Sequence, residues 1–270
     1  MDIKDLWLLD MSRVIYSLYI DIQNAVSHFE NKDKFNNNYD WLLDRHKQYA
    51  DLCGVEYKHF GYDENYIEFA QQFGPEISEY NIINFYKMHL LYQLDYDEIL
   101  YLDFDVVPVT KLNFFEEWDL SKGIAIMSED WNIPLKDKNR DRHSVRSPLA
   151  KSWNARAMLG HSTETFNTGI IGASKESLKD LDYFGEFDKT LELMTDLIND
   201  DFWPEDIRNL FGYDNETVFA YKVKTYQQLL GTGWHYFMDR WSYIPKDTKF
   251  VHCINKDFNY VRQWCEKNNL

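Results

Sequence analysis

Residues 96–107 read YDEILYLDFDVV, an apolar run that ends at two aspartates, Asp103 and Asp105. A short run rich in Ile, Leu and Tyr is typical of a strand, and we expect one over residues 98–102. Side chains two positions apart in an extended chain point to the same side, so the two carboxylates should lie close together. At about 4 Å and an effective dielectric of about 20, their repulsion costs on the order of 4 kcal/mol.

A divalent cation held between the two carboxylates would remove this cost. Hard oxygen ligands suit Mg²⁺ or Mn²⁺, and Mg²⁺ commonly completes its shell with phosphate oxygens and water. The chain contains two other pairs with the same spacing, Asp95 with Asp97 and Asp180 with Asp182. Only the pair at 103 and 105 directly follows an apolar strand, and ligands of open parallel sheets bind beyond the carboxyl ends of strands. We therefore expect the cation here, with loop capping or pairing with lysine as the alternative role.

Strand and helix patterns alternate on both sides of this stretch. The expected further strands lie at 14–20, 55–60, 123–127, 166–172 and 249–253, and the expected helices lie at 41–52, 79–94, 187–198 and 215–221. Asn36, Asn37 and Asn38 should form a polar break before the first helix, and Gly54 should end it. The alternation predicts an α/β fold with a mostly parallel, twisted central sheet flanked by helices.

The length and composition favour one domain. The chain has 270 residues, of which 44% are hydrophobic, so it can bury a sizeable core. It contains no linker and no internal repeat, and we expect a single domain over residues 1–270. Residues 130–162 are polar and basic in places, and they are long for a loop, so we expect an insertion or a lid there.

Charge and cysteine content limit the partners and the location. The formal net charge is −16, which repels nucleic acid, so no nucleic-acid partner is expected. The three cysteines are odd in number and match no zinc pattern, which favours a reducing compartment. Residues 1–10 are too charged for a secretory signal, and no apolar run approaches the roughly 20 residues of a membrane span. We expect a cytoplasmic protein, or one trimmed of an anchor.

Residues 96–107 resemble the metal-binding D-x-D segment of GT-A fold glycosyltransferases. The resemblance is greatest to the retaining group that includes glycogenin and the bacterial lipooligosaccharide galactosyltransferases. Further segments follow in the family's order: FNTGII at 166–171 resembles its N-[ST]-G strand, and DNETVF at 214–219 resembles its D-Q-D-x-x-N helix start. His252 resembles the histidine that completes the family's metal site; the alternative is a structural histidine at the end of a strand. Asn215 stands where that family has Gln, and Glu216 replaces Asp. The family's glycine and lysine after the histidine are not at their usual spacing, since Lys256 lies four residues after His252.

The resemblance implies a metal-dependent, retaining hexosyltransferase. It would move a sugar from a nucleotide-diphosphate donor, a UDP- or GDP-sugar, to a hydroxyl of a glycan or glycoconjugate. The implied metal ligands are Asp103, Asp105 and His252, and the implied ion is Mn²⁺ or Mg²⁺. Such an ion would act as a Lewis acid on the diphosphate leaving group. The acceptor would enter beside residues 130–162.

The resemblance also implies roles for other residues. The expected donor-binding residues are Tyr16, Lys87, Asp103, Asn167, Thr168 and Gly169. A ring in the first strand, Tyr16 or Tyr19, could stack on the base. For Lys87 the alternative is a solvated lysine, and for residues 167–169 it is a plain turn.

The expected catalytic residues are Asp214, Asn215 and Glu216. Asp214 and Asn215 would face the donor sugar. In an inverting enzyme, Asp214 or Glu216 could instead be the base that deprotonates the acceptor. These residues also have the pattern of a helix N-terminus, where Asp caps and Glu suits the first turn.

Two other classes of protein fit part of the pattern. A haloacid dehalogenase-like phosphatase also places D-x-D after an apolar strand and uses the first Asp as a nucleophile. Its motif usually lies near the N-terminus, however, whereas here a strand–helix–strand unit precedes it. A non-catalytic carbohydrate- or nucleotide-binding protein is the other alternative.

Overall fold

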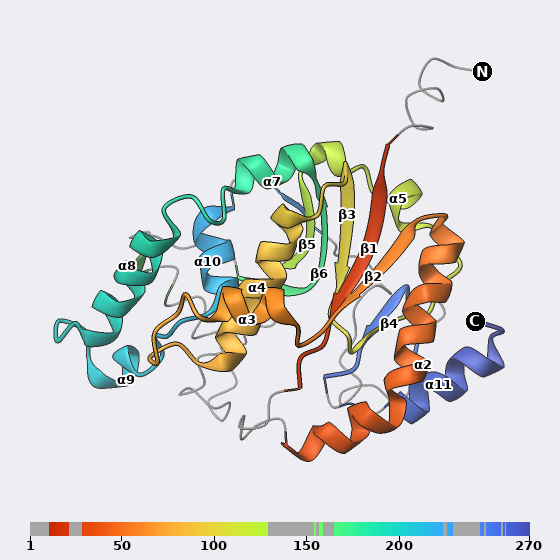
Figure 1. The fold of residues 1–270 in the computed structure, drawn as a ribbon, viewed down its shortest axis with the longest axis horizontal. Coiled ribbons are helices and arrows are strands. Elements are labelled where there is room, and N and C mark those ends of the chain that lie inside the picture. Colours follow the sequence, from red (N-terminus) through yellow and green to blue (C-terminus); the bar gives the residue numbers. More distant parts are fainter. Residues whose placement is uncertain are drawn as a thin grey trace.

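The centre of the computed structural model is a six-stranded sheet with the strand order β2-β1-β3-β6-β5-β7 (Figure 1). Its strands are β1 (Arg13–Leu18), β2 (Glu56–Phe60), β3 (Glu98–Leu102), β5 (Ile124–Ser128), β6 (Phe166–Ser174) and β7 (Tyr226–Gln228). A two-stranded antiparallel sheet joins β4 (Val106–Pro108) to β8 (Phe250–His252). The structure describes residues 11–21, 29–128, 154, 157–158, 165–223, 226–228, 244–245, 247–254, 256 and 258–270.

The predicted fold class is confirmed. Parallel pairing joins β1 to β2, β1 to β3 and β5 to β7. Strand β6 pairs antiparallel with both β3 and β5, so among the described strands of this sheet it alone runs in the opposite direction. The start of β6 therefore lies at the carboxyl end of β3, where the two aspartates follow. This reversal brings residues 167–169 to the candidate site.

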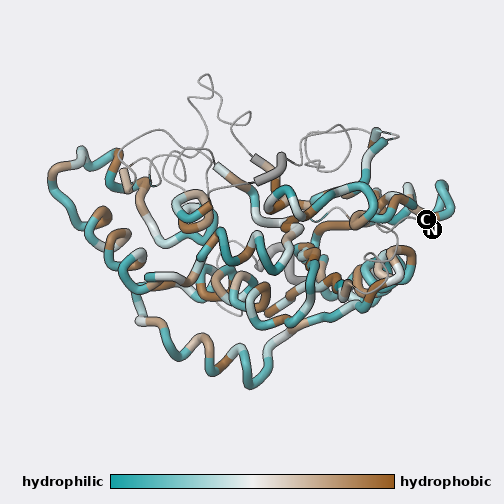
Figure 2. The backbone as a smooth tube through the Cα atoms, turned by 90° about the horizontal axis from the view of Figure 1, so that it is seen from above, coloured by the Kyte–Doolittle hydropathy of each residue, from teal (hydrophilic) through white to brown (hydrophobic). Residues whose placement is uncertain are grey.

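Helices cover both faces of the sheet (Figure 1). In the described part of the chain they are α2 (Phe29–Cys53), α3 (Glu64–Ala70), α4 (Glu79–Gln93), α5 (Phe114–Glu117), the 3₁₀ turn η1 (Leu120–Lys122), α7 (Lys175–Leu181), α8 (Phe187–Asn199), α9 (Glu205–Arg208), α10 (Asn215–Lys222) and α11 (Phe258–Lys267). The outer helices alternate teal and brown along their length in Figure 2. This is the pattern of amphipathic helices that turn one face to the core.

Alternate residues of each central strand enter different cores. Val14 and Tyr16 of β1 pack with α4 on one face, whereas Ile15 packs with Tyr49 of α2 and with α5 on the other. Because both faces are buried, the central strands read as continuous apolar runs. A third core lies under β4, β8 and α11, and it contains Phe104 from between the two aspartates.

The structure corrects one boundary. The three asparagines at 36–38 do not break the chain, since α2 runs without interruption from Phe29 to Cys53. The Asn38 side chain donates to the backbone oxygen of Lys34 within the helix. Phe35 and Leu42 pack into the third core, and this tertiary packing overrides the weak helix propensity of asparagine. The helix ends as predicted at Gly54, which has φ +67°.

The other predicted strands and helices agree with the structure to within a few residues at each end. The predicted insertion or lid at 130–162 lies outside the described residues, except for residues 154, 157 and 158. Of the helices that the structure describes, none combines the length and the apolar character that crossing a membrane requires.

Candidate active site

Asp103 and Asp105 lie directly after β3, at the edge of the sheet. A tight turn holds them, in which the Val106 backbone nitrogen donates to the Asp103 oxygen at 2.8 Å. Phe104 points the other way, into the third core, and is 3% exposed. The turn thus directs the two carboxylates to one side and anchors the ring between them on the other. The Asp103 side chain is 27% exposed and that of Asp105 is 10% exposed.

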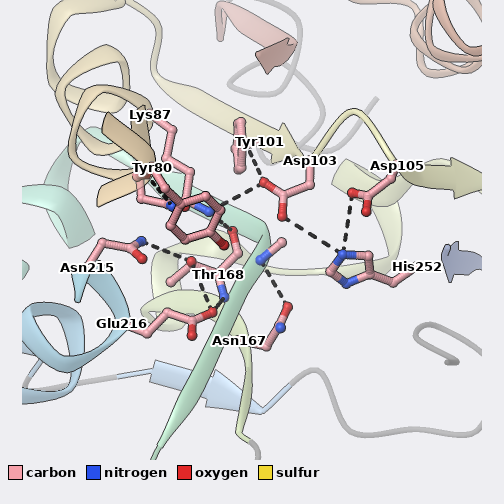
Figure 3. Close-up of polar contacts among 12 residues, drawn as sticks. Tyr80, Lys87, Tyr101, Asp103, Asp105, Asn167, Thr168, Asn215, Glu216 and His252 are labelled. Carbon is pink, nitrogen blue, oxygen red and sulfur yellow. Dashed lines mark hydrogen bonds and ion pairs between the residues drawn. The ribbon is translucent and has the colours of Figure 1, made fainter. Parts of the chain in front are cut away.

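His252 reaches this pair through the small sheet. It lies opposite Val106 in the β4–β8 register, and the Cys253 nitrogen donates to the Asp105 oxygen at 2.9 Å. His252 Nε2 lies 3.4 Å from Asp105 Oδ1 and 3.9 Å from Asp103 Oδ2 (Figure 3). One ligand atom from each of the three residues lies within 4.8 Å of the others. Two carboxylates and an imidazole at this spacing suit a divalent ion such as Mn²⁺.

Gly169 makes room for the histidine. Its backbone oxygen accepts from the Asp103 nitrogen at 2.8 Å, which fixes the start of β6 against the end of β3. A Cβ at position 169 would lie 2.7 Å from His252 Cε1 and 2.9 Å from Asn167 Oδ1. Only glycine permits this close approach, which gives a structural reason for glycine at position 169.

Lys87 of α4 is not a solvated lysine. The residue is 3% exposed, and its Nζ lies 3.3 Å from Asp103 Oδ1. The same ammonium donates to the Thr168 backbone oxygen at 3.2 Å and lies 5.3 Å from the centre of the Tyr101 ring. A buried cation with these partners belongs to the aspartate site (Figure 3).

The structure corrects the expectation for Tyr16. Its ring is fully buried against Phe60 and Tyr101, and no face is open to stack on a base. The hydroxyl donates to the Lys87 backbone oxygen at 2.6 Å, and burial raises the pKa of Tyr16 well above its usual value. Tyr16 therefore holds α4 in place through its hydrogen bond to the Lys87 backbone. Tyr19, the other ring considered, is half-buried and stacks on Phe104 with 5.3 Å between ring centres.

The start of α10 docks onto β6. Asp214 is the N-cap, and its carboxylate accepts from the nitrogens of Glu216 at 2.8 Å and Thr217 at 3.1 Å, so the helix-cap alternative is confirmed. Asn215 donates to Thr168 Oγ1 at 3.0 Å. Glu216 accepts from the Thr168 nitrogen at 2.8 Å. The expected donor-binding and catalytic segments therefore meet at Thr168 (Figure 3).

Sequence reasoning missed several neighbours of the aspartates. The Tyr101 hydroxyl donates to Asp103 Oδ1, and alternation along β3 could have revealed it because residues 101 and 103 share a side. Tyr80 of α4 lies beside Lys87 in Figure 3. The Lys256 ammonium pairs with Asp105 Oδ2. From the sequence, Lys256 stood out only as a departure from the family's spacing after His252, with no role assigned to it.

Neighbouring side chains determine the charge state of Asp105. Burial raises the pKa of its carboxyl, but Lys256 and His252 outweigh this effect and hold the pKa well below its usual range. Asp105 is therefore an anion at neutral pH, as a metal ligand must be.

A second layer of histidines supports the same turn. His46 of α2 is fully buried, and its Nε2 donates to the Val106 backbone oxygen at 2.6 Å. His59 lies with its ring centre 4.8 Å from that of Phe104 and bonds to Ser17 and Tyr39. Burial lowers the pKa of both histidines to about 4, so both are neutral at physiological pH.

Taken together, the α/β sheet, the carboxylate pair with its histidine and the adjacent buried lysine form the arrangement expected of a nucleotide-sugar transferase. The chain belongs to glycosyl transferase family 8, whose sequence profile matches residues 1–203, about three quarters of the 270 residues. It is a glycosyltransferase that uses a nucleotide-sugar donor, and the GT-A fold expected from the sequence is confirmed. No observation on the described residues favours the phosphatase or the non-catalytic binding protein.

Three solved structures illustrate the similarity. A glycosyltransferase involved in glycosylation of the major capsid of PBCV-1 is 16% identical, with 92% of this chain and 99% of that chain covered and a TM-score of 0.49. The galactosyltransferase LgtC is 14% identical, with 88% and 86% covered and a TM-score of 0.48. Mouse xyloside xylosyltransferase 1 is 12% identical, with 91% and 99% covered and a TM-score of 0.46. Among curated protein sequences, no match to the chain is found.

Proposed function

We propose that the protein is a metal-dependent, retaining hexosyltransferase that takes its sugar from a UDP- or GDP-sugar. The observation that carries the metal dependence is the cluster of Asp103, Asp105 and His252, whose ligand atoms lie within 4.8 Å of one another. These three residues would hold Mn²⁺ or Mg²⁺. The retaining outcome rests on the resemblance of the D-x-D, N-[ST]-G and helix-start segments to the retaining group.

The bound ion would supply Lewis-acid stabilisation of the diphosphate leaving group. Lys87 adds a preorganised cation beside it, because its buried ammonium is already oriented by Asp103 and the Thr168 oxygen. A fixed charge of this kind stabilises developing negative charge with little reorganisation. Asn167, Thr168 and Gly169 form the edge of the site on which the donor sugar would lie.

The start of α10 supplies the proposed catalytic residues. Asn215 and Glu216 contact Thr168 and would face the donor sugar. The Asp214 carboxylate is already an acceptor for two helix nitrogens, so we assign it the positioning of this helix start. The amide of Asn215 cannot act as a base, whereas the carboxylate of Glu216 can accept a proton.

The remaining parts of the proposal concern the surroundings of the site. The nucleobase of the donor would lie beside Tyr19. The acceptor, a glycan or glycoconjugate, would enter beside residues 130–162. We propose that residues 1–270 form one catalytic domain. A cytoplasmic location is supported by Cys53, Cys253 and Cys265, which are all buried free thiols. Labelling of the chain on intact cells by a reagent that does not cross membranes would contradict that location.

The test is a screen of nucleotide sugars for donor hydrolysis and transfer, with Mn²⁺ and with chelator. We expect turnover of one UDP- or GDP-sugar that chelator abolishes and that Asp105→Asn reduces by at least about 100-fold. Asp180→Asn is the matched control, because Asp180 is an exposed aspartate on α7 with the same D-x-D spacing. Full turnover in chelator, or in Asp105→Asn, would refute the proposal. The anomeric configuration of the product tests retention.

A further inference from the structure

Both carboxylates of the proposed metal site already have an ammonium partner. Lys87 pairs with Asp103, and their side chains are 4% and 27% exposed. Lys256 pairs with Asp105, and both of these side chains are 10% exposed. The two lysines come from α4 and from the segment after β8, so the chain brings them to the aspartates independently.

Lys256 is held in place at Asp105. Its backbone has φ +60°, in the left-handed region, and its nitrogen donates to the Cys253 oxygen at 2.9 Å. The backbone nitrogen of Cys253 in turn donates a hydrogen bond to the Asp105 backbone oxygen. The ammonium lies 5.2 Å from the centre of the Phe35 ring, a cation–π contact. The lysine and the aspartate are thus joined through both backbone and side chain.

The two oxygens of Asp105 are both engaged. Lys256 takes Oδ2, while His252 Nε2 lies 3.4 Å from Oδ1. A metal ion that binds Asp105 must therefore compete with the ammonium for the same carboxylate. A buried carboxylate retains a cationic partner because the unpaired charge is costly, so the ammonium leaves only when another cation replaces it.

The charge balance of the site also disfavours binding of the ion alone. Two carboxylates and two ammonium groups sum to zero. A divalent ion that displaces the Lys256 ammonium from Asp105 therefore leaves an excess of positive charge in a poorly solvated site. A diphosphate that arrives with the ion cancels this excess. On the basis of the proposed metal site, we infer that Lys256 is the resident counter-cation of Asp105. It keeps the affinity for the free ion low, so that ion and nucleoside diphosphate bind as a unit.

The test measures Mn²⁺ binding by the electron paramagnetic resonance signal of free Mn²⁺, without substrate turnover. Removal of the competing ammonium in Lys256→Met should tighten binding of Mn²⁺ alone by about tenfold or more. UDP and GDP are then each added to the wild type and to Lys256→Met. The diphosphate should strengthen Mn²⁺ binding by a larger factor in the wild type. Lys256→Arg, which keeps the charge, should behave as the wild type.

Two controls separate the inference from the proposed metal site. Lys249→Met removes an ammonium from the same segment, where Lys249 pairs with Glu117 at 2.8 Å, and should leave Mn²⁺ binding unchanged. Asp105→Asn should weaken Mn²⁺ binding; if it does not, the metal site itself is wrong. If Asp105→Asn weakens binding but Lys256→Met binds Mn²⁺ no more tightly than the wild type, the counter-cation role is refuted and the metal site stands. Circular dichroism establishes that each variant is folded, and Lys256→Gln replaces Lys256→Met if that variant is not.

Discussion

Buried histidines should make the turn that carries the aspartates sensitive to acid. His46 is fully buried, and burial lowers its pKa from 6.5 to about 4. The unfolded chain therefore binds a proton at higher pH than the folded chain does. Folding stability from this group is complete above about pH 6.5 and is lost as the pH falls toward 4.

The magnitude follows from the two pKa values. At about pH 5 the unfolded chain is almost fully protonated at His46, whereas the folded chain is mostly neutral there. The resulting loss of unfolding free energy is about 2 kcal/mol relative to neutral pH. The pKa of His59 is lowered in the same direction, but this residue is only half-buried, so its effect should be smaller.

The assay is urea unfolding, followed by tryptophan fluorescence, of the wild type and His46→Gln between about pH 7.5 and pH 5. The glutamine amide can donate to the Val106 oxygen, as His46 Nε2 does at 2.6 Å, but it does not titrate. Comparing the two proteins cancels the titration of all shared groups. We expect their difference in unfolding free energy to shift by about 2 kcal/mol in favour of the variant at the lower pH. A difference that stays constant with pH would refute the reasoning.

Three further variants test the contacts of the site. Gly169→Ala should displace His252, because the added Cβ would lie 2.7 Å from its ring; overpacking of this kind costs about 1–3 kcal/mol, and thermal unfolding and Mn²⁺ binding should both show the loss. Lys87→Met should weaken nucleoside diphosphate binding by about tenfold or more in calorimetry, because it removes the cation beside Asp103. Glu216→Gln separates two roles: its amide oxygen can still accept from the Thr168 nitrogen, so turnover assays should show substantial activity if Glu216 positions the donor and almost none if it is a base.

Each of these variants has a matched control. Gly61→Ala adds a Cβ with an ordinary contact of 3.7 Å and should leave stability nearly unchanged. Lys122→Met removes an exposed ion pair with Asp119, which should matter little. Glu176→Gln is the control for Glu216→Gln: it makes the same change in the first turn of α7 and should leave turnover unchanged. Loss of Mn²⁺ binding, diphosphate binding or turnover in the respective control would contradict the assignment of these effects to the site.

The D-x-D strand and the alternation around it were predictable because their signals are local. An apolar run that ends in two like charges identifies β3 and the position of the two aspartates at its end. The two carboxylates share a side as expected, but a turn and not an extended chain places them there. Gly54 likewise ends α2 through its own backbone preference. Local patterns also predicted the strand at 166–172 and the helix at 215–221, whereas the roles of residues in these segments came from the resemblance to the family.

Features that depend on tertiary packing were not predictable from the pattern. The direction of β6 depends on its partners β3 and β5, so the meeting of Gly169 with His252 had no sequence signal apart from the resemblance. From the sequence, the Tyr16 ring could stack on a nucleobase. Only the packing of α4 shows that the ring is fully buried. The helix through 36–38 depends on the core that receives Phe35 and Leu42.

The most direct test of the central claim is a crystal grown with Mn²⁺ and the nucleoside diphosphate that binds, recorded at a wavelength where manganese scatters anomalously. We predict one strong anomalous peak coordinated by Asp103, Asp105 and His252, with diphosphate oxygens completing its shell. A diphosphate bound with no manganese at these three residues, or manganese bound only elsewhere, would contradict the account.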